Sequence, residues 1–123
     1  MMDVLLVQPG FARNRQFGNK NRSLVPPMML HYLAKPLLKE GLDVDVLDLS
    51  TYAISDVRLE EYIKHWNPRI VGITSVTENF FSALNVAKLI RSTKPETPIV
   101  VGGPHVSFTT EKTLQYDCID LSL

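Results

Sequence analysis

The sequence has little of what a secreted, membrane-spanning or nucleic-acid-binding protein needs. Its single cysteine, Cys118, cannot form a disulfide within the chain, and the apolar start MMDVLLV is too short for a signal peptide. No apolar run approaches the roughly 20 residues that cross a bilayer. Thirteen basic and thirteen acidic residues cancel, so no overall field attracts nucleic acid or an anionic membrane surface. We therefore expect a cytoplasmic protein with no nucleic-acid or membrane partner.

The chain also lacks the motifs of several common cofactor and catalytic sites. A nicotinamide-binding fold carries G-x-G-x-x-G after its first strand, where this chain has QPGFAR at residues 8–13, and a Walker A loop is absent as well. A phosphoacceptor receiver domain needs acidic residues after the first strand and an aspartate ending the third, but Gln8-Pro9 and Thr74-Ser75 occupy these positions. No cysteine cluster or His/Cys spacing indicates a zinc or iron–sulfur site. The sequence thus predicts no catalytic residues and no metal ligands.

What the sequence does contain is a regular alternation of short apolar runs and stretches of helical periodicity. This alternation is typical of βαβ units on a parallel sheet, and 123 residues suit one domain with one core. The predicted strands are Val4–Val7, Asp43–Leu49, Ile70–Ser75, Ile99–Val101 and Ile119–Leu123. The predicted helices lie between Pro27 and Gly41, around Leu59–Trp66, around Phe80–Ile90 and, as a short one, at about Thr109–Leu114. We therefore expect an α/β, flavodoxin-like (Rossmann-like) fold of three layers.

The polarity of each strand predicts its place in the sheet. Strands buried on both faces are apolar throughout, whereas strands at the margin carry polar residues on one side. The second strand contains three aspartates and the fifth contains Asp120 and Ser122, so these two are predicted to be the edges. Right-handed crossovers then give a five-stranded parallel sheet of order 2-1-3-4-5, in which ligands bind beyond the carboxyl ends of the first and third strands.

Three segments converge on that predicted crevice, and each has two interpretations. Hydroxyl groups after the third strand could hydrogen-bond a buried heterocycle, or could only cap the following helix. A glycine pair after the fourth strand could let a flat ligand group approach the backbone, or could only relieve crowding in a tight turn. The histidine that follows could contact ligand or be an ordinary surface residue. The candidate binding residues are Gln8, Pro9, Thr74, Ser75, Val76, Thr77, Gly102, Gly103, Pro104 and His105.

The connection from Gln8 to Val25 is longer than most strand-to-helix connections. It contains basic residues and no acidic ones, so this edge of the domain is expected to be locally positive. Two interpretations remain open. The segment is either a mobile, solvated loop or a lid that approaches a ligand phosphate or a neighbouring domain.

Two long segments resemble the cobalamin (vitamin B12)-binding domain that precedes the catalytic barrel of many radical SAM enzymes. They are VPPMMLHYLAKPLLKEGLDVDVLDL at residues 25–49 and VGITSVTENFFSALNVAKLIRSTKPETPIVVGGPH at residues 71–105. The family signature in the second segment is S-x-L followed later by G-G, and Thr74-Ser75-Val76 and Gly102-Gly103 occupy those places.

The resemblance implies how a cofactor would bind. Thr74, Ser75 and Thr77 would contact the dimethylbenzimidazole tail of cobalamin, and the glycine pair would let this tail slot between the sheet and the helices. Other B12 enzymes carry D-x-H-x-x-G after the first strand, and its histidine ligates cobalt. Residues 8–25 contain neither that motif nor any histidine, so the resemblance implies binding that is independent of this histidine.

The resemblance also implies partners. Residues 1–123 would be the N-terminal cobalamin-binding part of a longer, methyltransferase-like radical SAM enzyme, whose downstream domain binds S-adenosylmethionine and a [4Fe–4S] cluster through C-x-x-x-C-x-x-C. In the 2-1-3-4-5 order, a helix after the fifth strand normally shares one sheet face with the first helix, whereas this sequence ends at Leu123. We therefore expect one undercovered sheet face, available to that domain or to a second copy of the chain. Two alternatives are a degenerate α/β docking module that binds no corrinoid and a flavodoxin-like FMN binder. The FMN alternative is disfavoured because this chain has no Ser/Thr-Gly phosphate loop after Val7.

Overall fold

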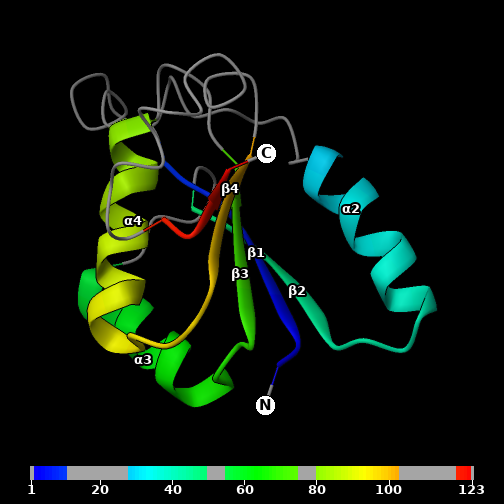
Figure 1. Cartoon of the computed structure of the whole chain (residues 1–123), viewed down its shortest axis with the longest axis horizontal. Coiled ribbons are helices and arrows are strands. Elements are labelled where there is room, and N and C mark those ends of the chain that lie inside the picture. Colours follow the sequence, from blue (N-terminus) through cyan, green and yellow to red (C-terminus); the bar gives the residue numbers. More distant parts are fainter. Residues whose placement is uncertain (1, 11–27, 50–54, 75–79, 103–118, 123) are drawn as a thin grey trace.

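A computed structural model of the chain describes residues 2–10, 28–49, 55–74, 80–102 and 119–122. Strands and helices alternate through these residues, as the apolar runs and helical periodicities predict (Figure 1). In chain order they are β1 (Val4–Gln8), α2 (Met28–Lys39), β2 (Val44–Asp48), α3 (Asp56–Trp66), β3 (Ile70–Thr74), α4 (Phe80–Thr93), β4 (Ile99–Gly102) and β5 (Leu121–Ser122). The short helix predicted near Thr109 lies outside the described residues.

The sheet is parallel, and its four longer strands have the predicted order β2-β1-β3-β4. The fold is thus an α/β, flavodoxin-like arrangement with helices between the strands. The sequence predicts that the fifth strand begins at Ile119, whereas β5 begins at Leu121. Two residue pairs join β5 to β4. Leu123 lies outside the described residues. β1 and β3 are neighbours at the centre of the sheet, which is the switch point expected from the sequence.

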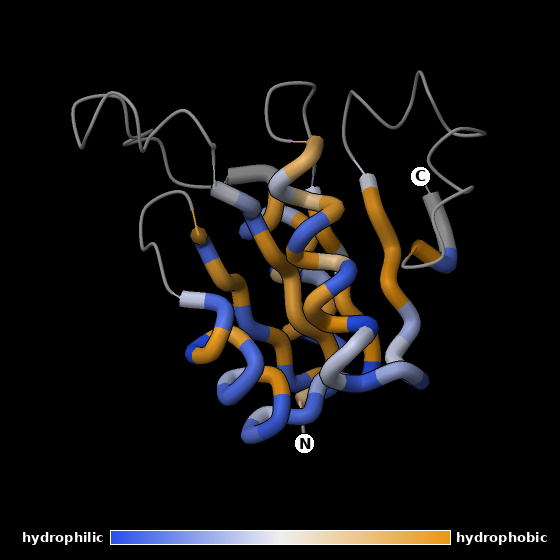
Figure 2. Tube along the Cα trace, turned by 90° about the vertical axis from the view of Figure 1, so that its left-hand side faces the viewer, coloured by the Kyte–Doolittle hydropathy of each residue, from blue (hydrophilic) through white to orange (hydrophobic). Residues whose placement is uncertain are grey.

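The helices cover the two faces of the sheet unequally. Figure 1 shows α3 and α4 together on one side of the sheet and α2 on the other. The larger core lies on the α3/α4 side, where Leu5, Val7 and Ile63 are completely buried. On the other side, a smaller cluster joins Leu6 of β1 to Leu30 and Ala34 of α2. Figure 2 shows apolar residues running along the strands, whereas the helices alternate between apolar and polar residues, as expected for amphipathic helices on a sheet.

Local sequence signals define where the helices begin and end. Gly41 ends α2 in the left-handed region at φ 81°, and its N–H donates to the Leu38 carbonyl at 3.1 Å while the next N–H, of Leu42, donates to the Leu37 carbonyl at 3.2 Å. These two bonds form a Schellman motif, so the helix ends at the glycine that the sequence sets as its limit. The Ser55 hydroxyl caps the start of α3 by accepting from the Arg58 N–H at 3.3 Å.

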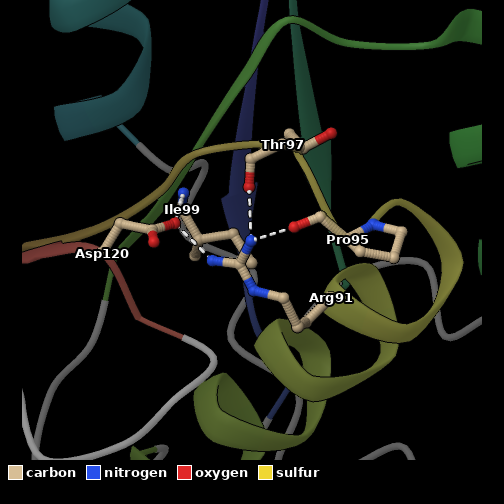
Figure 3. Close-up of polar contacts among 5 residues, drawn as sticks. All are labelled: Arg91, Pro95, Thr97, Ile99 and Asp120. Carbon is tan, nitrogen blue, oxygen red and sulfur yellow. Dashed lines mark hydrogen bonds and ion pairs between the residues drawn. The ribbon is translucent and has the colours of Figure 1, made fainter.

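A polar cluster joins the end of α4 to the start of β4 and the residue before β5 (Figure 3). The Arg91 guanidinium pairs with the Asp120 carboxylate and donates to the backbone carbonyls of Pro95 and Thr97. Asp120 also accepts from the Ile99 N–H at 2.8 Å, and its own N–H donates to the Ile99 carbonyl at 3.0 Å. Arg91 therefore fixes the short β5 against β4 at the amino end of these strands.

Candidate functional site

A pocket of about 330 Å³ lies on the α2 side of the sheet, against β1, β3 and β4. It extends from the amino ends of β1 and β3 to the carboxyl ends of β3 and β4. The residues that line it are Val4, Leu6, Leu30, Leu33, Ile70, Gly72, Ile73, Thr74, Val100 and Gly102. The pocket thus runs along the central strands and reaches the edge of the sheet where the sequence predicts ligand binding.

The alternation of side chains along β3 and β4 leaves this space. Successive residues of a strand point to opposite faces, so Val71 and Ile73 are buried on the α3/α4 side while Gly72 and Thr74 face α2. β4 repeats the pattern, because Ile99 and Val101 are buried and the residues between and after them are only partly covered. Among the described residues, α2 packs against β2 and β1, which leaves this face of β3 and β4 less covered.

Gly72 shapes the floor of the pocket. It is paired with Leu6 of β1 across the parallel ladder, and a Cβ atom built on Gly72 would lie 3.0 Å from the Leu6 Cδ2 atom. Any side chain at this position would therefore displace Leu6 and occupy the space between the sheet and α2. A glycine inside a strand often marks a close approach of another group to the backbone, and this one leaves a flat surface open.

Several of the candidate residues lie at this end of the sheet. Thr74 and Gly102 end their strands side by side as register partners, and both line the pocket. Gln8 ends β1 and, by alternation with Leu6, lies on the same face, although it does not line the pocket. Pro9 is completely buried, so its side chain is not accessible. Ser75, Val76, Thr77, Gly103, Pro104 and His105 lie outside the described residues.

The sequence did not single out the apolar residues of the pocket. Leu6, Leu30 and Leu33 fit helix and strand periodicities, and nothing in such a pattern separates a pocket wall from core. Gly72 carried a usable signal, since it interrupts the apolar run of β3 at a position that otherwise favours a β-branched side chain. Gly72 together with Thr74 and Gly102 marks one face of two neighbouring strands.

The ionisable groups with perturbed pKa values lie away from the pocket. Burial, and then the hydrogen bond to Asp45, raise the pKa of the Tyr62 hydroxyl on α3. Asp120, next to β5, has a lowered pKa and contacts Arg91 at the opposite end of β4 from Gly102. Within the described ranges, no three His, Cys, Asp or Glu side chains come close enough together to hold a metal ion. The described lining of the pocket is therefore suited to holding an apolar group.

None of the helices in the described part of the chain is long and apolar enough to cross a membrane.

Comparison with known proteins identifies relatives that are much longer than this chain. It is 36% identical over 123 residues to an uncharacterized methyltransferase of Pyrococcus horikoshii, covering 98% of this chain and 26% of the relative. It is 29% and 30% identical over 115 residues to the anaerobic magnesium-protoporphyrin IX monomethyl ester cyclases of Rubrivivax gelatinosus and Cereibacter sphaeroides. Those alignments cover 93% of this chain and 20% and 18% of the cyclases. The chain thus spans about a quarter or less of the length of these relatives.

A family model also matches most of the chain. The model of the B12 binding domain family matches residues 17–122, a range that includes α2, all the strands after β1 and most of the pocket wall. A match over this much of the sequence shows that the chain belongs to the B12-binding domain family.

Proposed function

We propose that this chain is the cobalamin-binding module of a larger enzyme, and that the pocket beside α2 receives the dimethylbenzimidazole tail of the cofactor. The observation that carries the proposal is the position of the pocket. Its lining reaches the ends of β3 and β4, at Thr74 and Gly102, and extends along the sheet over the bare backbone of Gly72.

The size and lining of the pocket suit the tail rather than the corrin ring. Ligand pockets in proteins span about 300–1,000 Å³, and about 330 Å³ lies at the lower end of that range. A planar base can lie against Gly72, and the Thr74 hydroxyl can hydrogen-bond the polar part of the tail at the pocket mouth. Ser75, Thr77, Gly103, Pro104 and His105 follow these strands in the sequence, and we propose that they extend the contact.

The chain's role in this proposal is to position and shield the cofactor. When bound, cobalamin supplies the cobalt centre on which the chemistry of a B12 enzyme depends. The segment after β1 begins Gln8-Pro9-Gly10 and provides no histidine through residue 25. We therefore propose that the cofactor is held without a cobalt-ligating histidine from this segment.

The relatives indicate the kind of enzyme to which the module would belong. One is named as a methyltransferase and two as cyclases, and each is about four to six times as long as the part that matches this chain. We propose that the parent protein is a radical SAM enzyme of this kind, and that S-adenosylmethionine and a [4Fe–4S] cluster bind in its other domain. A C-x-x-x-C-x-x-C motif in the parent sequence is the expected sign.

Corrinoid retention tests the proposal directly. The purified chain is incubated with hydroxocobalamin and desalted, and we expect its visible spectrum to keep the corrin absorbance in proportion to protein. Leu33→Trp should weaken retention about tenfold, because the indole would fill the pocket from α2 and overpacking costs about 1–3 kcal/mol.

Leu38→Trp is the matched control. Leu33 and Leu38 lie on the same helix and are both 54% exposed, but only Leu33 lines the pocket. The control should bind corrinoid as the unsubstituted chain does. Absence of retained absorbance at micromolar protein would refute cobalamin binding by this chain, and equal loss in both variants would refute the assignment to this pocket.

A docking module that binds no corrinoid is the second candidate. The observation in its favour is the exposure of apolar side chains on α2 outside the pocket, at Tyr32 and Leu38. In a protein several times longer, this helix offers a surface for a neighbouring domain or for another copy of the chain. Failure of corrinoid retention in the unsubstituted chain would favour this function over the first.

A further inference from the structure

The lining of the pocket changes in polarity from the carboxyl ends of the strands to their amino ends. Thr74, at the carboxyl end of β3, is the one residue with a polar side chain among the described residues that line it. Below this level lie Gly72 and Val100, and at the amino ends of the strands lie Val4 and Ile70. A group that enters from the strand ends therefore passes one hydroxyl and then meets only aliphatic side chains and glycine backbone.

The backbone at this depth is already engaged. β1 pairs with β3, and β3 pairs with β4, in continuous parallel ladders through Gly72 and Val100. The N–H and C=O groups of central strands are taken up by these ladders. A polar atom that a bound ligand presses against this lining would lose its hydrogen bonds to water and find no replacement among the described residues.

This environment distinguishes the two main classes of lower base that a corrinoid can carry. A dimethylbenzimidazole presents two methyl groups on its far edge, so its deep end is apolar. A purine such as adenine presents an amino group and ring nitrogens there, all of which hydrogen-bond to water. Resting on the proposed function, we propose that this pocket selects corrinoids by their lower base, accepting benzimidazoles with apolar substituents and rejecting purines.

The test compares three corrinoids with the same chain. They are cobalamin, its analogue with adenine as lower base, and cobinamide, which lacks the nucleotide tail altogether. All three are used as their dicyano forms in excess cyanide, so that both axial positions on cobalt are filled and no base is coordinated. Dissociation constants are measured by equilibrium dialysis with visible absorbance, and any differences then reflect the pocket rather than the metal.

We expect cobalamin to bind most tightly and the adenine analogue to bind about ten- to hundredfold more weakly, the range expected for burying an unpaired polar group. Cobinamide should also bind more weakly than cobalamin, because it leaves the pocket unfilled. Equal affinity for cobalamin and the adenine analogue would overturn the selectivity while leaving corrinoid binding intact. Equal affinity for cobalamin and cobinamide would show that the tail lies elsewhere and would also overturn it. Absence of binding by all three would refute the proposed function and this inference with it.

A single hydroxyl placed in the depth of the pocket tests the physical cause. Val100→Thr keeps the shape of the side chain and adds a hydrogen-bonding group beside the base, so the ratio between the two dissociation constants should narrow several-fold. Val57→Thr, on the exposed surface of α3, is the control and should leave the ratio unchanged. An unchanged ratio in the folded Val100→Thr chain would contradict selection by this part of the pocket.

Discussion

At the residue scale, Arg91 and Asp120 illustrate how one ion pair holds a very short strand in place. β5 has only two paired residues, yet Asp120 bonds to both the N–H and the C=O of Ile99, and Arg91 holds the turn that precedes β4. Burial raises the pKa of the Asp120 carboxyl, but the bond from Ile99 and the charge of Arg91 outweigh it and hold the pKa below its ordinary value. The folded state therefore favours the ionised carboxylate.

The pH dependence of stability follows from this shift. A carboxyl whose pKa is lowered in the folded state stabilises the protein above its unfolded pKa, about 3.9, and this contribution is lost as the pH falls through the lower folded pKa. Because the Asp120 side chain is 46% exposed, we expect Asp120→Asn to cost about 1 kcal/mol at pH 7 and almost nothing near pH 2. Thermal melting at both pH values measures this.

Glu61→Gln, which removes an exposed carboxylate on α3, is the control and should change stability little at either pH. A loss in Asp120→Asn that is the same at pH 7 and pH 2 would show that the ionised form of Asp120 is not what stabilises β5.

At the element scale, the end of α2 depends on the backbone of one residue. Gly41 adopts φ 81°, and no atom lies within 4 Å of a Cβ built on it, so a substitution meets no steric contact and acts through conformation alone. We expect Gly41→Ala to lower the free energy of unfolding by about 1–2 kcal/mol, the cost of the left-handed conformation for a residue with a Cβ. Urea unfolding measures this difference.

Two further variants distinguish this cause from a general effect of substitution. Glu40→Ala, one residue earlier and exposed, should cost less, and Gly41→Asn should restore part of the loss because asparagine tolerates the left-handed region. If Gly41→Ala and Glu40→Ala were equally stable, the Schellman motif would not be what ends the helix.

Element boundaries and strand order could be predicted from the sequence because they depend on local signals. Apolar runs, helical periodicity, Gly41 and the aspartates of β2 each act within a few residues, and together they predicted the order β2-β1-β3-β4. The pocket depends instead on which side of the sheet a helix leaves open, and that depends on contacts between distant residues. Thr74 and Gly102 could be selected because strand ends converge, whereas Leu33 could not be told from any other helical leucine.

At the scale of the whole molecule, the two faces of the sheet differ in how completely the described helices cover them. On the α3/α4 side a large core joins both helices to the sheet, whereas on the other side α2 contacts the sheet through a smaller cluster and borders the pocket. We expect the chain to bind a hydrophobic fluorescent dye, and Leu38→Lys on the outer surface of α2 to reduce the fluorescence. Dye titration of the two proteins at equal concentration measures the difference.

Val57→Lys on α3 is the comparison, since Val57 is even more exposed, at 63%, but lies on the closed side of the molecule. It should reduce the fluorescence less than Leu38→Lys does. A larger effect of Val57→Lys would mean that α2 is not the main apolar surface.

The glycine in β3 also ties the pocket to the parity of a strand. Because side chains alternate along β3, adding or removing one residue before Gly72 would turn Ile73 toward α2 and bury the glycine in the α3/α4 core. The cavity would be filled and the opposite core would lose a large side chain in the same event. Natural length variation in this domain is therefore expected in the connections between strands. The number of residues in β3 determines which of its side chains face the pocket.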